Sequence, residues 1–171
     1  MNSDGWTIFE TAIGACGLVW EKNKVVRFLL PEKNPQAMAG KLIKITGRNQ
    51  QSPALSGWIK ALMRQISKHL KGHSQDFSEI PLDFERVTEF QRLVYLGAQR
   101  IPSGQIRTYK ELAVMIGKPK AARAVGQALG KNPFALLVPC HRILASGNKP
   151  GGFTAYGGLK TKAKLLACEG W

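Results

Sequence analysis

A polar stretch over residues 72–83 divides the chain into two halves with different hydrophobic patterns, and this change constrains the fold more than any other feature. Before it, runs of β-branched and aromatic residues alternate with glycines and a Lys-Asn-Lys turn. These runs predict a small antiparallel sheet with strands over residues 6–12, 18–21 and 25–30. After the polar stretch the pattern is helical. We therefore predict an α/β (α+β) fold, with an N-terminal α/β domain over residues 1–82 and a mostly helical C-terminal domain over residues 83–171.

Two helices are expected after the sheet, one over residues 36–45 and one that starts at Pro53. Ser52 would cap the second helix, and Pro53 would occupy its first position, where the N–H that proline lacks has no partner. Apolar residues then recur every three to four positions. His69 and His73 lie four residues apart here and could share a metal ion. No cysteine or acid pair accompanies them, so we predict no metal site.

The C-terminal half predicts a helix-turn-helix after an entry helix over residues 87–98. Thr108, with a glutamate three residues later, forms the capping box of the first short helix. Gly117 ends that helix, and Pro119 begins the next one, over residues 120–129. The sequence thus places two short helices on either side of a tight turn.

The second helix of this pair consists largely of alanine and glycine, so much of its surface is nearly bare backbone. It can pack closely against another helix or against the wall of a DNA groove. The basic residues around it are Lys118, Lys120, Arg123 and Lys131. It offers few of the side chains that read base edges in the major groove. If it binds DNA, it should therefore recognise backbone and shape and not the base sequence.

The charge balance favours a polyanionic partner. The chain carries 25 Lys and Arg residues against 11 Asp and Glu, a net charge of +14. The excess is larger over residues 83–171, with 14 basic and 5 acidic residues, than over residues 1–82, with 11 and 6. Such an imbalance in a globular domain favours nucleic acid, with an anionic membrane surface as the lesser alternative.

The sequence argues against a secreted or membrane-spanning protein. No window approaches the ~18 consecutive apolar residues that cross a bilayer, and the polar N-terminus lacks the features of a secretory signal. Three widely spaced cysteines favour a reducing compartment over a disulfide framework. We expect a protein of the cytoplasm, or of the nucleus in a eukaryote.

The candidate nucleophile is Cys140, which follows an apolar, strand-like run over residues 134–138 and precedes His141. A nearby imidazole lowers the pKa of a thiol, and the thiolate is the nucleophile. Adjacent residues do not face each other on a strand or helix, so the two can cooperate only through a turn or a bridging water. An acid would have to orient the imidazole, and Glu111 and Glu169 are the candidates. A structural cysteine beside a capping histidine is the alternative.

Residues 138–143, Val-Pro-Cys-His-Arg-Ile, closely resemble the active-site motif of the O6-alkylguanine-DNA alkyltransferases, the methylated-DNA–protein-cysteine S-methyltransferases. Further matches follow in the family's order: Ile101-Pro102, Gly104, Tyr109, Leu112-Ala113, Gly117, Pro119, residues 121–126, Asn132-Pro133, Gly157-Gly158, Leu165-Leu166 and Glu169-Gly170. The resemblance covers residues 90–171. The N-terminal half resembles the family only in its layout of a small sheet with helices.

This resemblance implies DNA repair by an irreversible, stoichiometric reaction without a cofactor. The alkyl group of O6-alkylguanine, or less readily of O4-alkylthymine, passes to the protein's own Cys140, so each molecule acts once. His141 takes the thiol proton through a water, and Glu169 orients that imidazole. Tyr109 steers the phosphate of the flipped nucleotide and donates toward the leaving guanine. Asn132 braces the turn that carries the cysteine.

The resemblance also implies a monomer that binds double-stranded DNA from the minor groove, whatever its sequence, and flips the damaged base out of the stack. Arg123 would fill the vacated space. The implied DNA-binding residues are Tyr109, Lys120, Ala122, Arg123, Gly126 and Lys131. The implied substrate pocket consists of Leu129, Ile143, Tyr156 and Gly157. The carbonyls of Cys140 and Ile143 would accept hydrogen bonds from the guanine edge.

The sequence departs from the family pattern in three respects. The loop over residues 146–156 is longer than the common form, and Tyr156 takes the place of a small residue whose amide faces the guanine oxygen. Cys168 stands where a histidine is frequent, and we interpret it as structural. Some members bind zinc in the N-terminal half, but Cys16 and the two histidines of this half do not reproduce those ligands, which again predicts no metal.

Three other functions stay open at this point. A lesion-binding relative without transfer activity would lack the cysteine at position 140. A regulator switched by methylation would need a second sensor cysteine in an N-terminal metal-binding domain, whereas this half has only Cys16. A thiol protease would need a peptide cleft, which no segment suggests.

Overall fold

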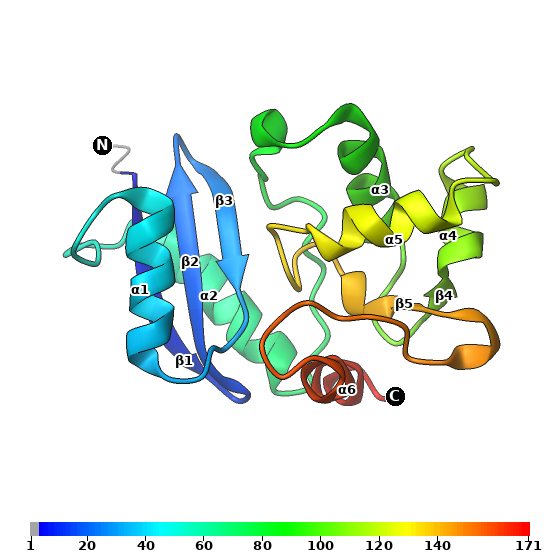
Figure 1. Cartoon of the computed structure of the whole chain (residues 1–171). Coiled ribbons are helices and arrows are strands. Elements are labelled where there is room, and N and C mark those ends of the chain that lie inside the picture. The colour runs from blue at the N-terminus through cyan, green and yellow to red at the C-terminus, as the bar shows by residue number, and fades with distance from the viewer. Residues whose placement is uncertain (1–3) are drawn as a thin grey trace.

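The computed structural model describes residues 4–171, and its N-terminal part is a three-stranded antiparallel meander (Figure 1). The strands pair in chain order: β1 (Gly5–Thr11), β2 (Gly14–Glu21) and β3 (Lys24–Leu29). Lys22 and Asn23 connect β2 to β3 with φ angles of 48° and 63°. A two-residue loop with two positive φ angles matches the twist of adjacent antiparallel strands. The predicted sheet is confirmed.

A helix covers each face of the sheet, because apolar residues alternate along the strands. One face packs against α1 (Pro35–Thr46), and the opposite face packs against α2 (Gly57–Leu70) (Figure 1). The buried sheet residues on the α1 side are Trp6, Val19 and Val26. Those on the α2 side include Leu18, Trp20, Val25 and Phe28.

The polar segment after α2 attaches to the edge of β3. Val25 N donates to Pro81 O at 2.8 Å, and Asp83 N donates to Val25 O at 2.8 Å. Phe28 N donates to Pro133 O at 3.0 Å, so both this segment and the C-terminal half cover the edge that β3 would otherwise expose. A continuous hydrophobic core extends from the sheet into the C-terminal helices. The division into domains at residue 82 stays a prediction.

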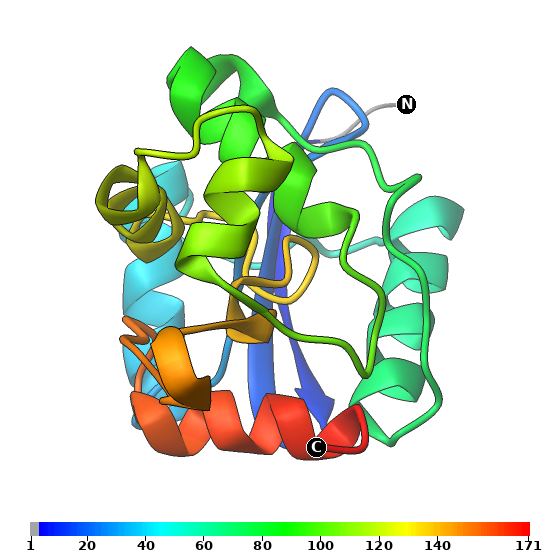
Figure 2. The ribbon, with the colours of Figure 1, turned by 90° about the vertical axis from the view of Figure 1, so that its right-hand side faces the viewer.

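The C-terminal half is mostly helical, as predicted. Its α-helices are α3 (Glu89–Gln99), α4 (Tyr109–Met115), α5 (Ala122–Gly130) and α6 (Leu159–Cys168). Its 3-10 helices are η1 (Phe84–Arg86), η2 (Cys140–Arg142) and η3 (Ser146–Asn148), and its short parallel strands are β4 (Arg107–Thr108) and β5 (Ile143–Leu144). Figure 2 shows α6 along one end of the molecule, below the sheet and α4. Over residues 4–171, no helix has both the length and the apolar composition to cross a membrane.

Helices α4 and α5 form the predicted helix-turn-helix. Thr108 Oγ1 accepts from Glu111 N at 3.1 Å, and Glu111 Oε2 accepts from Thr108 N at 2.6 Å, which completes the capping box of α4. Gly117 then adopts a φ of 72°, the left-handed conformation that commonly ends a helix. Helix α5 packs against both α3 and α4.

The expected start of α2 at Pro53 is wrong. The helix begins at Gly57, after Ser56 as N-cap. The backbone N–H of Ser52 instead donates to Trp6 O at 3.0 Å, so this residue lies against β1. A tertiary hydrogen bond therefore overrides the local helix-start signal.

Two expectations in the C-terminal half are also wrong in detail. Helix α5 begins at Ala122, so Pro119 and Lys120 lie in the turn before it. Residues 134–138 are largely buried, as the apolar run suggested, but they form a turn and not a strand. Leu136 has a φ of 69°, and the N–H of the last residue donates to the carbonyl of the first at 2.8 Å.

The contact between α3 and α4 provides a test of the packing. A Cβ at Gly97 would lie 2.4 Å from Ile116 Cγ2 and 3.1 Å from Leu112 Cδ1. We expect Gly97→Ala to lower the free energy of unfolding by about 1–3 kcal/mol, because a packed core resists an added methyl group. Thermal unfolding should show a loss of about 2–4 °C in Tm per kcal/mol.

The control is Gly40→Ala in α1, where no atom lies within 4 Å of the new Cβ. Alanine is a better helix former than glycine, so this variant should gain up to about 1 kcal/mol. Equal stabilisation of the two variants would contradict the close packing of α3 on α4.

Candidate active site

Cys140 follows a turn that the side chain of Asn132 braces. The Asn132 amide donates to Val138 O at 2.9 Å, and its oxygen accepts from Phe134 N at 2.9 Å. After the 3-10 helix η2, the chain enters β5, which pairs with β4. The cysteine is therefore fixed between a closed turn and a strand pair.

Cys140 is partly exposed as a residue, and it packs against the hydrophobic core. Burial raises its pKa above the ordinary value of 9.0, although the Asn132 amide and the Lys162 ammonium act in the opposite direction. At neutral pH the resting group is therefore a thiol, and it needs a proton acceptor before it can act as a nucleophile.

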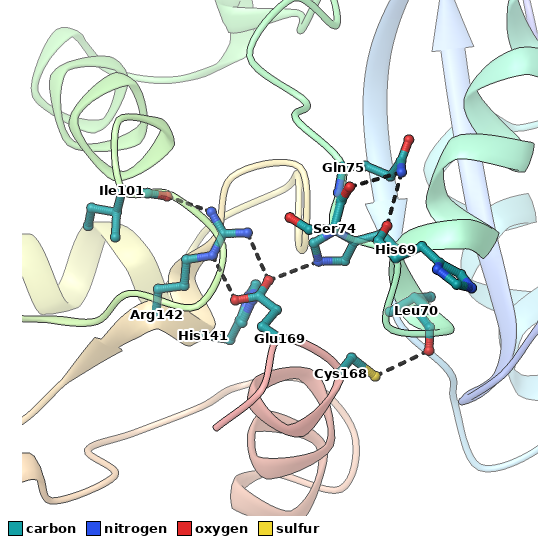
Figure 3. A network of polar contacts seen from close by, with 10 residues as sticks. His69, Leu70, Ser74, Gln75, Ile101, His141, Arg142, Cys168 and Glu169 are labelled. Carbon is teal, nitrogen blue, oxygen red and sulfur yellow. Dashed lines mark hydrogen bonds and ion pairs between the residues drawn. The ribbon is translucent and has the colours of Figure 1, made fainter.

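The buried carboxylate of Glu169 gathers the polar groups of this region (Figure 3). Its Oε1 accepts from His141 Nε2 at 2.8 Å and from His69 Nε2 at 2.9 Å. Arg142 donates to the two carboxylate oxygens from Nη2 and Nε, at 2.8 and 2.9 Å, and from Nη1 to Ile101 O at 2.5 Å. Burial alone would raise the pKa of Glu169, but these hydrogen bonds outweigh it and hold the pKa well below its usual range. The other candidate acid, Glu111, is engaged in the cap of α4.

The imidazole of His141 is fully buried and has one free acceptor position. Burial lowers its pKa below the ordinary 6.5, against the opposing effect of Glu169. The ring is thus neutral at neutral pH, and its Nε2 proton points to the carboxylate. Within residues 4–171, its Nδ1 has no hydrogen-bond partner. An unpaired buried lone pair is costly, so this atom is suited to accept from a water or a reacting group.

A buried lysine fixes the loop over residues 146–156. Lys162 Nζ donates to Ile143 O at 2.6 Å, to Pro150 O at 2.6 Å and to Gly152 O at 3.4 Å. Burial lowers the pKa of Lys162, while nearby Cys140 acts to raise it. The Ile143 carbonyl, expected to face a guanine edge, therefore already accepts one hydrogen bond from the protein.

Tyr109, the first residue of α4, lies between α5 and this loop. A Cβ at Gly126 would lie 3.6 Å from its ring, and one at Gly151 would lie 2.8 Å from its hydroxyl. Gly151 also has a φ of 69°, so only glycine fits at that point. Burial raises the pKa of Tyr109, which keeps its hydroxyl protonated and able to donate at neutral pH.

The small-residue surface of α5 borders a shallow cavity of about 320 Å³. Of the expected DNA-binding residues, Tyr109, Ala122, Arg123 and Gly126 line it together. Arg123 is exposed and forms no ion pair or hydrogen bond with any described residue of 4–171. Lys120 and Lys131 lie outside the cavity, at the two ends of α5.

The residues expected to form the substrate pocket differ in how far they are buried. Leu129 and Ile143 are buried, whereas Tyr156 is 52% exposed. Thr154 Oγ1 donates to Gly130 O at 3.0 Å and ties the loop to the end of α5. Gly157 has a φ of 84°, and a Cβ there would lie 2.4 Å from Thr161 Oγ1, so the turn into α6 requires glycine.

Comparison with known proteins identifies the family. Residues 89–171 match the family described as “6-O-methylguanine DNA methyltransferase, DNA binding domain”. A methylated-DNA–protein-cysteine methyltransferase of Methanosarcina acetivorans is 34% identical over 167 residues, which cover 96% of this chain and 97% of that protein. The chain belongs to the methylated-DNA–protein-cysteine methyltransferase family.

Further relatives agree with this membership. The methyltransferase of Mycolicibacterium paratuberculosis is 42% identical over 123 residues, which cover 68% of this chain and 72% of that protein. The crystal structure of Mycobacterium tuberculosis OGT in complex with DNA has a TM-score of 0.76 and 32% identity, covering 96% of this chain and 91% of that one. As a member of this family, the protein is an enzyme that repairs DNA by transferring an alkyl group to a cysteine.

Sequence reasoning gave no role in the methyltransferase site to His69, Arg142 or Lys162. His69 follows Ile66 by three residues and precedes Leu70, on the apolar face of α2. Lys162 lies three residues before Leu165, on the buried side of α6. A polar residue at an inward position of a helix was the available signal, because such a group needs a buried partner.

Both ring nitrogens of His69 are engaged in hydrogen bonds. One ring nitrogen accepts from Gln75 N at 3.1 Å, and the other is bonded to Glu169. Across residues 4–171, no cluster of three or more His, Cys, Asp or Glu side chains could hold a metal ion. His73, four residues further along the chain, is exposed.

Proposed function

We propose that Cys140 takes up the alkyl group, and that the substrate is O6-alkylguanine, or less readily O4-alkylthymine, in double-stranded DNA. The orientation of the neighbouring His141 carries this proposal, because Glu169 holds Nε2–H and leaves Nδ1 free as a base. Within residues 4–171, neither of the other cysteines is hydrogen-bonded to a histidine. Burial raises the pKa of Cys16 to about 12, and Cys168 Sγ donates to a backbone carbonyl of α2 at 3.2 Å.

The proposed reaction is a single displacement at the alkyl carbon. His141 Nδ1 takes the thiol proton through a bridging water, and Glu169 stabilises the imidazolium that forms. Sulfur bonds to the alkyl carbon while the bond from that carbon to O6 breaks, and the electron pair stays on the guanine. Tyr109 donates a hydrogen bond toward the leaving base, and the guanine anion takes up one proton from solvent while the imidazolium of His141 releases one. The thioether is stable, so each molecule acts once and no cofactor is needed.

We propose that α5 enters the minor groove and binds DNA without regard to sequence. Its alanine and glycine surface allows a close approach, and the exposed Arg123 is free to fill the space of a flipped base. Lys120 and Lys131 would pair with phosphates at the two ends of the helix. The protein would act as a monomer where the DNA is, in the cytoplasm, or in the nucleus of a eukaryote.

The proposed pocket for the damaged base lies between the end of α5 and the loop over residues 146–156. Leu129 and Ile143 provide apolar walls, and Gly157 permits the turn that closes the pocket. Tyr156, in the longer part of the loop, forms the exposed lip. Asn132 holds the turn on which the thiol is presented.

The first test is the mass of the cysteine-bearing peptides after incubation with a duplex that contains O6-methylguanine. We expect one methyl group per molecule, on Cys140, and no second turnover. Cys140→Ala should abolish alkyl transfer, because it removes the thiol that accepts the alkyl group. It should leave DNA binding largely intact, because α5 makes the contacts with DNA. Repeated turnover, or methylation at Cys16 or Cys168, would contradict the assignment.

The pH dependence tests the roles of Cys140 and His141. The reactive form holds a proton on the thiol and none on the imidazole. Burial raises the pKa of the thiol above 9.0 and lowers that of the imidazole below 6.5. The single-turnover rate with the free base O6-benzylguanine should therefore be flat from about pH 7 to about 8.5, and fall at lower pH as His141 is protonated.

A rate that rises tenfold per pH unit through this range would show that a free thiolate reacts without help from the imidazole. His141→Gln serves as the comparison and should show that rising profile, since glutamine cannot take a proton.

Arg123→Ala tests the proposed insertion into the base stack. Flipping a base costs a few kcal/mol, and an inserted side chain recovers part of it. We expect the variant to repair duplex DNA about tenfold or more slowly, which corresponds to about 1.4 kcal/mol or more. The rate with free O6-benzylguanine should hardly change. Equal losses in both reactions would instead assign Arg123 to the fold or to the thiol.

A further inference from the structure

The carboxylate of Glu169 is held from both halves of the chain. His69, in the last turn of α2, is only 1% exposed and places Nε2 at 2.9 Å from Glu169 Oε1. Their neighbours in the chain are also hydrogen-bonded, because Cys168 Sγ donates to Leu70 O at 3.2 Å. Two hydrogen bonds therefore join the C-terminal end of α2 to the C-terminal end of α6. Figure 2 shows these two helix ends side by side.

The backbone decides which nitrogen of His69 carries the proton. Gln75 N donates to Nδ1 at 3.1 Å. A backbone N–H can only donate, so Nδ1 must present its lone pair. The single ring proton of neutral His69 is then on Nε2, where it points to Glu169. Both ring nitrogens of His69 are thus satisfied, and the ring is held with its Nε2–H directed at the carboxylate.

This donor acts on the same oxygen that orients the proposed base. Glu169 Oε1 accepts from His69, His141 and Arg142, and Figure 3 shows the carboxylate between His69 on one side and Arg142 on the other. Glu169 is the C-cap of α6, a position where helices fray unless they are held. A carboxylate that shifted would release Nε2–H of His141 and with it the free lone pair on Nδ1.

We propose that His69 is a positioning residue of the transfer reaction. By donating Nε2–H to Glu169 Oε1, it holds the carboxylate in the place that keeps His141 in its reactive tautomer, so the N-terminal half completes the acceptor site. This inference rests on the proposed function of Cys140 and His141.

The test compares His69→Phe with wild type in single-turnover benzyl transfer from O6-benzylguanine to Cys140, well below the Tm of both. We expect a rate about tenfold lower, equivalent to about 1.4 kcal/mol in the barrier. His69→Gln should recover most of the rate, because its amide N–H can still donate. The matched control is His73→Phe, the same change at an exposed ring four residues away, which should react at the wild-type rate.

A double-mutant cycle separates positioning from packing. If His69 acts through Glu169, His69→Phe should change the rate little in a Glu169→Gln background, whereas the loss of its buried hydrogen bonds should lower the Tm in both backgrounds. A wild-type rate for His69→Phe, or an equal loss in both backgrounds, would overturn the proposal.

Nitrogen NMR of histidine-labelled wild-type protein provides a readout that holds even if His69→Phe does not fold. We expect the neutral Nε2–H tautomer for His69, and an Nδ1–H form would overturn the proposal. Failure of the proposed function looks different, since wild type would then form no benzylated Cys140 at all.

Discussion

Four hydrogen bonds to one buried carboxylate connect the parts of this protein that the reaction requires. Glu169 is the C-cap of α6, His69 lies in the last turn of α2, and His141 and Arg142 belong to the 3-10 helix that begins at Cys140. A carboxylate without partners in the interior would cost several kcal/mol, so the folded state depends on the presence of its donors. The bidentate arginine also reaches the backbone after α3. One charge thus joins segments that lie far apart in the sequence.

A second buried charge fixes the path of the loop over residues 146–156. The three protons of the Lys162 ammonium match three carbonyl groups, one in β5 and two in the loop over residues 146–156. This loop is rich in glycine and exposed residues, so it has no hydrophobic core of its own. Its path against Tyr109 follows from the lysine on one side and from the close approach of Gly151 on the other. The surroundings of the thiol are therefore set by polar contacts.

In the proposed function, buried groups carry out the proton transfer and the surface of α5 contacts the DNA. The interior supplies proton transfer, through groups whose pKa values burial and hydrogen bonding move apart. The surface of α5 supplies close approach and positive charge, with few side chains that could read bases. An enzyme that repairs damage anywhere in a genome needs chemical selection in a pocket and not recognition of a sequence, and this arrangement suits that need.

Local patterns predicted much of the fold. The sheet, the capping box of α4 and the turn at Gly117 follow from residues that are neighbours in the chain, so the sequence suffices for them. The starts of α2 and α5 were wrong because local signals compete with tertiary contacts, such as the bond between Ser52 N and Trp6 O. The apolar run over residues 134–138 indicated burial correctly, but periodicity could not show that the backbone turns there.

For the site, the order of motif residues pointed to Cys140, His141 and Glu169 through a resemblance, and composition pointed to a polyanionic partner. Only the tertiary structure placed His69 and Arg142 on the same carboxylate and Lys162 on the carbonyls of the loop. Each of these contacts joins residues that are at least 10 positions apart, and in one case 100. A sequence reports which groups need a buried partner, whereas the packing of distant segments decides which partner each group meets.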